Sequence, residues 1–402
     1  MKRILILGAA KNQMCLIRKA KELGYYVIVI DWTNDNPGIE LADKHYKGSI
    51  CDEDFCLQVA IKENIDGVIS NYEPAMPVCA YISTRLGLPG NDITGVKNLM
   101  NKSKCRIIQK HSGVYTPEFI ICDDLSSVIT KSKNLRYPIV IKPCEYSGSK
   151  GTSKIDHYDE QLIIKAYEDC LRISRDKAVA VEEFIEMPML TTVEGEIFIC
   201  NGEFLWNGLM FTTRNSFAPL IPATYSMPII LSKNQRLKVK SSLEKLFNNA
   251  GIKNGEYNIE GFFTNENDFF IIEINVRHGG NGLPNFVSIG TGLDYLKLLL
   301  TTSVSDYSYW DTIKSIRHYP QRYIANHVVY SNRNGILKKI NISDEISGFL
   351  VGIEYLVSEG KPVFQCKNAL DMIGMVHLEF PSLITYQKYY NKLETLITAV
   401  VE

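Results

Sequence analysis

The sequence has no Cys-x-x-Cys pair, although ten cysteines are spread along its 402 residues. Disulfide frameworks and structural zinc sites both rely on cysteines at short, regular spacings, so this arrangement argues against each of them. Scattered, unpaired cysteines are typical of proteins kept in a reducing compartment. We therefore expect a cytoplasmic protein whose cysteines are free thiols.

Neither sign of charge is in excess, because 44 lysines and arginines stand against 45 acidic residues. A net charge of −1 gives no general electrostatic reason to expect nucleic acid or a membrane surface as a partner. The first apolar run, residues 4–7, is also too short for a signal-peptide core or a membrane span. Any anionic small molecule must therefore be held by local groups.

Three motifs of well-known enzyme sites are missing as well. The turn at residues 8–13 lacks the second and third glycines of G-x-G-x-x-G, so a dinucleotide site is disfavoured even though Asp31 stands where a ribose-binding acid would. The small-residue loop at residues 145–151 is not a Walker A motif. No G-x-S-x-G elbow is present, so a serine hydrolase has no support.

The first ninety residues instead alternate strand and helix patterns. Apolar runs at residues 4–7, 27–30 and 67–70 predict buried strands. Helical patterns occupy residues 15–23 and 53–64 between them. Continuous apolar strands separated by helices are typical of a parallel sheet covered on both faces, so we expect an α/β domain here.

Beyond residue 115 the patterns indicate a mixture of α and β elements. Asn201-Gly202 between two apolar runs predicts a tight β-hairpin. The last eighty residues contain no motif to which we can attach chemistry. The other elements are expected as strands at 138–143, 178–185, 193–200, 203–210, 348–358 and 373–380, and as helices at 159–174, 235–250 and 384–400.

Residues 257–277 have the pattern of a further hairpin, with acidic residues on both arms. If its turn is centred between Glu266 and Asn267, Glu260 and Glu273 lie directly opposite each other, with Cβ atoms about 5 Å apart. Like charges in that arrangement destabilise a sheet, so we expect a cation between them. The alternative is a solvated hairpin face whose charges are incidental.

Side chains alternate along a strand, so Glu273, Asn275 and Arg277 share one face. Two carboxylates and an amide oxygen suit magnesium, which prefers hard oxygen ligands. We therefore expect Glu260, Glu273 and Asn275 to bind this metal. Arg277, just beyond them, can clamp phosphoryl oxygens with its planar fork.

Lys142 lies at the end of another apolar strand and precedes the loop of small residues. The lysine and the loop together can bind a phosphate group. The loop can also act as a lid that excludes water from a reactive phosphate. Its alternative interpretation is a flexible hairpin turn. Hydroxyl groups and backbone amides for phosphate come from Ser147, Gly148, Ser149, Lys150 and Gly151.

A strand end at residues 182–185 offers a backbone edge to adenine. A carbonyl there can accept from the amino group and an amide can donate to a ring nitrogen, while Phe262 and Ile272 would cover the ring. The alternative is an acidic strand end that faces water. The residues of this edge are Glu182, Glu183, Phe184 and Ile185.

In this order and at these distances the motifs resemble the ATP-grasp superfamily of ligases, over about residues 1–300. The segment that starts at Asn101 looks like the family's helix with the first nucleotide lysine. Its spacing to Gly113 matches Lys102 rather than Lys104. The resemblance implies ATP as cofactor, together with magnesium or manganese at the acidic hairpin.

The same resemblance implies roles for the basic residues. Lys102 and Lys142 would contact the α- and β-phosphates, and Arg277 would act with Lys142 in catalysis by stabilising the transferring group. A carboxylate would form an acylphosphate, which an amine then attacks to give an amide, ADP and phosphate. One departure is visible, because residues 187–190 lack the glutamate that holds ribose in many members, and Glu194 is the substitute that we consider.

Four domains are expected from the resemblance. They are a Rossmann-like N-terminal domain (1–95), a small ATP-grasp subdomain with the connecting helix and lid (96–190), a large subdomain with the metal site (191–310) and a C-terminal α+β domain (311–402). The fold class is thus α/β at the N-terminus, followed by an ATP-grasp fold of α+β type.

Within the superfamily, the N-terminal segment looks most like purine-biosynthetic ligases, with phosphoribosylglycinamide synthetase as the nearest activity. A ligase that forms dipeptides from amino acids is the alternative, and an ATP-binding regulator without turnover is the alternative of another class. We expect small-molecule carboxylate and amine substrates. Whether the protein forms a homodimer is left open. Glu73 follows the third strand, where open α/β sheets place ligands, and Arg214, Gly279 and Gly280 are further substrate candidates.

Overall fold

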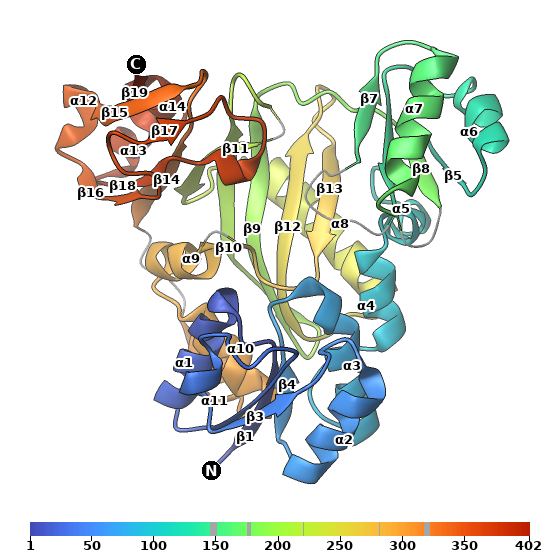
Figure 1. Ribbon diagram of the computed structural model, residues 1–402, viewed down its shortest axis with the longest axis vertical. Coiled ribbons are helices and arrows are strands. Elements are labelled where there is room, and N and C mark those ends of the chain that lie inside the picture. The colour runs from blue at the N-terminus through green and yellow to red at the C-terminus, as the bar shows by residue number, and fades with distance from the viewer. Residues whose placement is uncertain (145–150, 175–177, 220, 281, 317–321) are drawn as a thin grey trace.

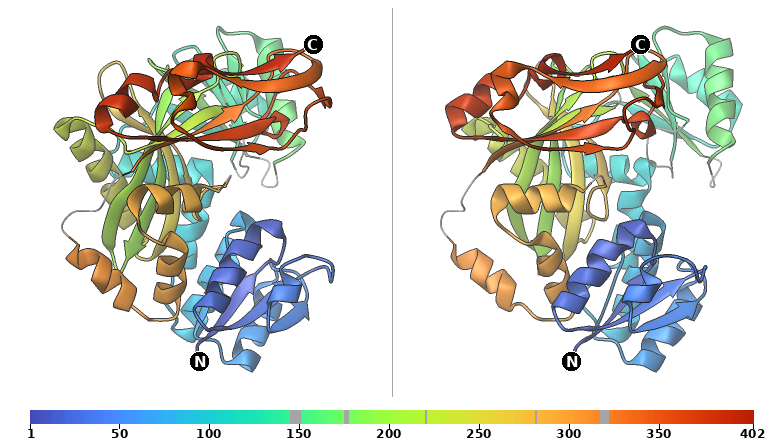
Figure 2. Two further views of the ribbon diagram at one scale, coloured as in Figure 1. Left: turned by 90° about the vertical axis from the view of Figure 1, so that its left-hand side faces the viewer. Right: turned by 60° about the vertical axis from the view of Figure 1, so that its left-hand side comes forward.

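The described residues form four sheets (Figure 1). Figure 2 shows the N-terminal sheet at one end of the molecule and the C-terminal strands at the other, with the central strands between them. All ten cysteines are free thiols, as their spacing predicts. No helix in the described ranges is long and apolar enough to cross a membrane. The structure is a computed structural model that describes residues 1–144, 151–174, 178–219, 221–280, 282–316 and 322–402.

The N-terminal sheet is parallel throughout, which confirms the prediction from the alternating pattern. One face packs against α1 (Met14–Glu22) and α10 (Tyr295–Ser303), and the other against α2 (Glu53–Glu63) and α3 (Met76–Leu86). The strand β3 was not predicted, because its residues are polar and partly exposed. In spatial order the strands are β3 (Lys44–Lys47), β2 (Tyr26–Asp31), β1 (Arg3–Leu7) and β4 (Gly67–Ile69).

A small antiparallel sheet holds Lys142 near the end of one strand. Helices α6 (Leu125–Ser132) and α7 (Glu160–Leu171) pack on this sheet in one apolar cluster. β8 lies between two partners, so both of its backbone edges are used within the sheet. In spatial order the strands are β5 (Phe119–Cys122), β8 (Val179–Glu183), β6 (Ile139–Pro143) and β7 (Ser153–Ile155).

The largest sheet has eight strands and contains the acidic hairpin at one edge. Helix α8 (Lys233–Asn249) packs with the apolar side chains of β9, β12 and β13. Asn201 and Gly202 both have positive φ (51° and 82°), as the tight turn between β9 and β10 requires. In spatial order the strands are β13 (Phe269–Asn275), β12 (Gly255–Phe263), β9 (Thr191–Cys200), β10 (Glu203–Arg214), β11 (Pro222–Met227), β14 (Tyr323–Val329), β18 (Gly374–Phe380) and β16 (Leu350–Tyr355).

Helix α5 begins at Lys102, and Asn101 caps it by accepting a hydrogen bond from Lys104 N (3.0 Å). The cap fixes the point at which the chain turns into the helix, and so where Lys102 stands. The bounds of α5 are Lys102–His111, and further helices are α4 (Ile93–Met100), α9 (Leu283–Thr291), α11 (Ser308–Ser315) and α12 (Asp344–Ser347).

The prediction of a final helix near residues 384–400 is confirmed only in part, because two short helices in this range are followed by a strand at Ile397–Val401. Ile397 and Val401 are β-branched and buried, and β-branched side chains favour strands. The last strand, β19, pairs antiparallel with β15, and this pairing decides the conformation. The elements in this region are α13 (Leu383–Tyr389), α14 (Leu393–Leu396), β15 (Gly335–Ile342), β17 (Pro362–Val363) and β19 (Ile397–Val401).

Asp31, the last residue of β2, is buried and organises the loops beside it. Its carboxylate accepts hydrogen bonds from Ala9 N (2.8 Å), Thr33 N (3.0 Å) and Asn36 Nδ2 (2.9 Å). Burial alone would raise the pKa of Asp31, but these bonds outweigh it and hold the pKa below its usual value. The carboxylate is therefore already hydrogen-bonded to groups of the same chain.

Replacing Asp31 with asparagine should lower the free energy of unfolding at neutral pH by about 1–3 kcal/mol, because buried amides lose a charged acceptor. The folded pKa lies below the unfolded one, so the wild-type advantage should persist above the unfolded pKa of about 3.9 and disappear as the pH falls through the folded value. Urea unfolding from neutral to acid pH measures this difference. Asp35→Asn, at an exposed position of the same loop, is the control, and an equal loss in both variants would contradict the assignment.

Candidate active site

Glu260 and Glu273 lie directly opposite each other on β12 and β13, as predicted. A β-bulge adjoins the pair, because the register shifts between Glu260 and Gly261, which faces Ile271. Ile272 is the extra residue, and Ile272 and Glu273 are half-exposed on an otherwise buried strand. Bulges commonly re-aim side chains next to active sites. The bulge therefore brings these two side chains to the surface.

The bulge also shows that the hairpin turn has a different centre from the one that the prediction assumed. Nearer the turn Phe262 pairs with Phe270, so the hairpin is centred on Glu266 and not half a residue later. Without the bulge, that turn would place Glu260 opposite Ile272. The predicted pair of glutamates is thus confirmed, but the assumed centre is wrong.

A third glutamate extends the pair into a row. Glu194 on β9 lies opposite Glu260, so Glu194, Glu260 and Glu273 follow one another across three neighbouring strands. Two cations meet this row, because Arg214 contacts Glu260 and Lys102 contacts Glu273. Arg214 is only 6% exposed, so a substrate would have to displace Glu260 to reach it. A role for Glu194 toward ribose stays a prediction.

The row contains three carboxylates for its two cations. Burial and then Glu260 raise the pKa of Glu194 to about 7, although Arg214 opposes the shift. Burial would also raise the pKa of Glu273, but Lys102 outweighs it and the pKa lies below its usual value.

The oxygen atoms of this row fit a hard cation. Glu194 Oε2 is buried without a hydrogen-bond partner among the described residues, and magnesium prefers carboxylate and amide oxygens. As they stand, the described side chains form no group of three histidine, cysteine or acidic residues arranged to hold a metal. Arg214 and Lys102 occupy two of the three carboxylates instead.

A second polar row runs beside the first on the same face of the sheet, since residues two apart along a strand share a face. Asn258 pairs with Asn275 on one side and with Glu196 on the other. Asn275 Nδ2 donates to Asn258 Oδ1 (3.2 Å), and Glu196 Oε1 accepts from Gly279 N (2.8 Å). Burial and then Glu256 raise the pKa of Glu196 to about 8. Glu196, which the sequence did not reveal, therefore fixes the start of the glycine loop.

Lys142 and Arg106 share one buried carboxylate. Glu182 Oε2 lies 2.8 Å from Lys142 Nζ, and Oε1 lies 3.0 Å from Arg106 Nε. Burial would raise the pKa of Glu182, but the two cations lower it to about 2. Burial lowers the pKa of Lys142 to about 8, although Glu182 opposes the shift. Arg106 also donates to the carbonyls of Ile271 and Ile272 (2.6 and 3.3 Å), which ties α5 to the bulged strand.

The predicted adenine edge is partly used within the small sheet. The amides of Glu183 and Phe184 donate to the carbonyls of Glu118 and Pro138 (3.0 and 2.8 Å). Glu182 is buried, so the alternative of an acidic strand end facing water is wrong for that residue. A bond donated to adenine would have to come from Ile185 or beyond.

Of the two side chains predicted to cover the adenine ring, Ile272 lines the cleft and Phe262 does not. Phe262 is 4% exposed and packs edge-on against Phe270, with ring centroids 5.3 Å apart. The Arg106 guanidinium lies 4.8 Å from the centroid of the Phe270 ring. Phe262 thus supports Arg106 through Phe270.

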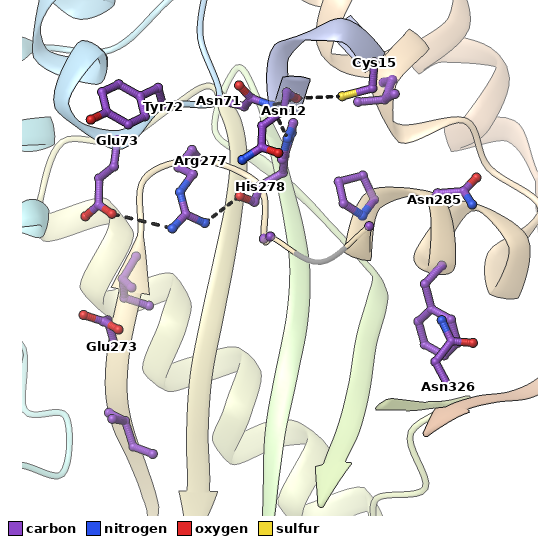
Figure 3. Close-up of a pocket in the computed structure, with 18 of the residues that line it drawn as sticks. Asn12, Cys15, Asn71, Tyr72, Glu73, Glu273, Arg277, His278, Asn285 and Asn326 are labelled. Carbon is purple, nitrogen blue, oxygen red and sulfur yellow. Dashed lines mark hydrogen bonds and ion pairs between the residues drawn. The ribbon is translucent and has the colours of Figure 1, made fainter. Parts of the chain in front are cut away.

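Figure 3 shows Arg277 in the loop after β13, between Glu73 and His278. Arg277 Nη2 lies 3.6 Å from Glu73 Oε2, and Nη1 donates to His278 O (2.7 Å). The ring of His278 reaches Asn71 Nδ2 (3.1 Å) and Glu256 Oε2 (3.4 Å). Burial lowers the pKa of His278 to about 4, so the ring is neutral at physiological pH. The carboxyl end of the parallel sheet therefore meets the end of the acidic hairpin here.

These elements surround an open cleft of about 1580 Å³. The loop residues Ser147, Gly148, Ser149 and Lys150 lie outside the described residues. The predicted residues that line the cleft are Glu73, Lys102, Lys142, Ile272, Glu273, Arg277, Gly279 and Gly280. Those that do not line it are Gly151, Glu182, Glu183, Phe184, Ile185, Arg214, Glu260, Phe262 and Asn275.

Two features of the cleft were not predicted. Arg106 stands four residues after Lys102, and that spacing places both on one face of a helix, so a signal was available. Asn326 and His377 line the cleft from strands of the C-terminal part, and no motif marks them.

Comparison with known proteins gives three findings. The family described as "D-ala D-ala ligase C-terminus" matches residues 113–299. A formate-dependent phosphoribosylglycinamide formyltransferase of Prochlorococcus marinus subsp. pastoris is 29% identical over 302 residues, which cover 71% of this chain and 73% of that relative. Two solved structures cover all of this chain: an L-amino acid ligase from Bacillus licheniformis (TM-score 0.76, 20% identity, 99% of that chain) and a phosphoribosylglycinamide synthetase from Anaerococcus prevotii (TM-score 0.71, 21% identity, 100% of that chain).

The parallel sheet and the antiparallel sheets share the fold of the ligases in these two solved structures, and the cleft lies between them. The chain is similar to ATP-grasp ligases in its fold and, over residues 113–299, in its sequence. Ligases of this superfamily are enzymes that use ATP as cofactor.

Arg106→Met should lower the free energy of unfolding by about 3 kcal/mol or more, because buried Glu182 keeps one cation and two carbonyls lose their donor. Urea denaturation at neutral pH measures this loss. Arg136→Met is the control, since its ion pair with Glu183 is 72% exposed on the arginine side and should be worth at most about 1 kcal/mol. Similar losses in the two variants would refute a special role for the buried arginine.

Proposed function

We propose that this protein joins a carboxylate to an amine through an acylphosphate, with conversion of ATP to ADP and phosphate. The observation that carries the proposal is that Glu273, at one end of the acidic row, lines one cleft together with Lys102 and Lys142. Substrate, nucleotide phosphates and a cation have matching groups there. We also propose that residues 96–190 and 191–310 hold the nucleotide, while 1–95 and 311–402 contribute the substrate side of the cleft.

Lys102 and Lys142 would contact the α- and β-phosphates. Each already pairs with a carboxylate, Glu273 and Glu182 respectively, and phosphate oxygens offer the same kind of charge-assisted bond. A pKa of about 8 keeps most of Lys142 protonated at pH 7. Adenine would lie near Ile185, with Ile272 against the ring.

Glu260, Glu273 and Asn275 would hold magnesium or manganese, with Glu194 beside them. When bound, such a metal neutralises phosphate charge and activates the γ-phosphoryl group for transfer. The unpartnered oxygen of Glu194 supports a cation at this row.

In the first step, a carboxylate oxygen of the substrate attacks the γ-phosphorus, and the bond to the β–γ bridging oxygen breaks, which gives an acylphosphate and ADP. In the second, the amine attacks the acyl carbon, loses a proton, and phosphate leaves with the C–O bond electrons. Arg277 would stabilise the transferring group and then the tetrahedral oxyanion. No side-chain nucleophile is needed.

Two classes of amine are supported by the relatives' names. One class is a sugar-phosphate amine, which is phosphoribosylamine for the synthetase and phosphoribosylglycinamide for the formyltransferase. The other class is a second amino acid, which corresponds to the L-amino acid ligase. Glu73, 3.6 Å from Arg277, is a candidate for holding the amine, and the amides of Gly279 and Gly280 are candidates for an anion. A regulator without turnover is disfavoured, because Lys102, Lys142, Glu273 and Arg277 are all present.

An ADP-release assay tests the function. Purified protein with Mg-ATP is given panels of amino acids, each with and without phosphoribosylamine, and with hydroxylamine as a general amine. We expect ADP release that depends on the carboxylate, and a hydroxamate when hydroxylamine is present. ATP binding without ADP release on any panel would instead support the regulator.

Glu273→Gln should reduce kcat by about 100-fold or more, because it removes charge at the proposed metal site. Circular dichroism and urea unfolding should show the fold retained. Glu266→Gln, in the exposed hairpin turn, is the matched control and should keep wild-type turnover. Normal magnesium-dependent turnover in Glu273→Gln would refute the metal assignment.

A further inference from the structure

The cleft has a second wall that the steps above do not use. It is built by α9 and by the strands β14, β16 and β18. Figure 3 shows Asn285 of α9 and Asn326 of β14 across the glycine loop from Glu273. A substrate that reaches Arg277 from this side would lie against this wall.

Much of the wall is apolar, and part of it is exposed. Val351 is 65% exposed, Leu356 53% and Ile289 39%. Exposed apolar side chains gathered in a cleft mark a place where the apolar part of a ligand binds. The apolar side chains of the wall include Ile289, Ile324, Val351, Leu356, Met372 and Met375.

Val351 lies at a bulge in the exposed edge strand β16. β16 pairs with β18, and the register shifts between Leu350 and Gly352, so Val351 is the extra residue. β16 and β13 are the two edge strands of the large sheet, and each is bulged where it lines the cleft. Bulges in edge strands change the direction of side chains. Val351 and Ile272 are each the extra residue of such a bulge, and both line the cleft.

The wall offers little to a phosphate group. Its charged residues in the described chain are Arg322, Glu354 and Glu379, and Arg322 Nε donates to Glu379 Oε1 (2.7 Å). Asn326 Oδ1 lies 2.8 Å from His377 Nδ1, and in the tautomer that donates this bond Nε2 is an acceptor. An acceptor nitrogen and a carboxylate suit an amino group, whereas a phosphoribosyl group needs cations.

We propose that this wall binds the side chain of an apolar amino acid, such as leucine, methionine or phenylalanine, as one of the two substrates. The inference rests on the proposed ligase function and selects amino acids over phosphoribosylamine. His377 Nε2 and the Glu354 carboxylate accept hydrogen bonds from the amino group of that substrate. The apolar side chain displaces water from Val351 and Leu356.

The test compares kcat/KM for ADP release with leucine and with glycine, each with hydroxylamine as the amine, and measures leucine binding by calorimetry. We expect leucine to exceed glycine by about 10- to 100-fold, the usual discrimination of an apolar pocket for added methylene groups. Val351→Asp and Leu356→Asp should each lower the leucine-to-glycine ratio at least about tenfold. Ile384→Asp, 80% exposed on α13 and outside the cleft, is the matched control and should leave the ratio unchanged.

The outcomes separate the two proposals. The proposed role of the wall is overturned if ADP release shows no preference for leucine, or if neither cleft variant changes that preference. The proposed ligase function stands in both cases. Faster ADP release with glycine and phosphoribosylamine than with any apolar amino acid also overturns the wall. If leucine binds, Val351→Asp weakens that binding, and no substrate gives ADP release, the proposed role of the wall is supported and the proposed ligase function is overturned. If the protein neither binds leucine nor releases ADP with any substrate, both proposals are overturned.

Discussion

Three glutamates on adjacent strands, Glu194, Glu260 and Glu273, impose the constraint on which the rest of the site depends. Carboxylates so close together repel one another, and burial strengthens the repulsion. Arg214 pairs with the middle glutamate, Glu260, and Lys102 pairs with Glu273 at one end, while Glu194 at the other end keeps a buried oxygen without a hydrogen-bond partner among the described residues. The cap that places Lys102 and the bulge that exposes Glu273 serve this same compensation.

Much of the fold and part of the site follow from local patterns. The strands of the parallel sheet are continuous apolar runs, and Asn201-Gly202 allows few alternatives to a tight turn. Opposed glutamates on β12 and β13 could be predicted because one hairpin connects them, even though the bulge lies between them and the turn. Local sequence constrains neighbours along the chain, and these features involve only neighbours.

The remainder depends on contacts between distant segments. Lys44–Lys47 joins the parallel sheet by backbone bonds to β2, and residues 397–401 form a strand because β15 lies beside them. Glu182 cannot be recognised as a shared counter-ion until α5 brings Arg106 against it. The apolar wall likewise draws on helix α9 and on strands that come together only in the folded sheet.

The internal pairing of Lys102 with Glu273 and of Lys142 with Glu182 has a consequence for how a nucleotide enters. Both ammonium groups lost most of their hydration when the chain folded, so at the proposed site an incoming polyphosphate would exchange one anion for another instead of capturing hydrated cations. The released carboxylates then need new counter-charge, which a divalent ion arriving with the nucleotide supplies. Nucleotide and metal should therefore enter as a single neutralised unit, with affinity less sensitive to added salt than the number of charges suggests.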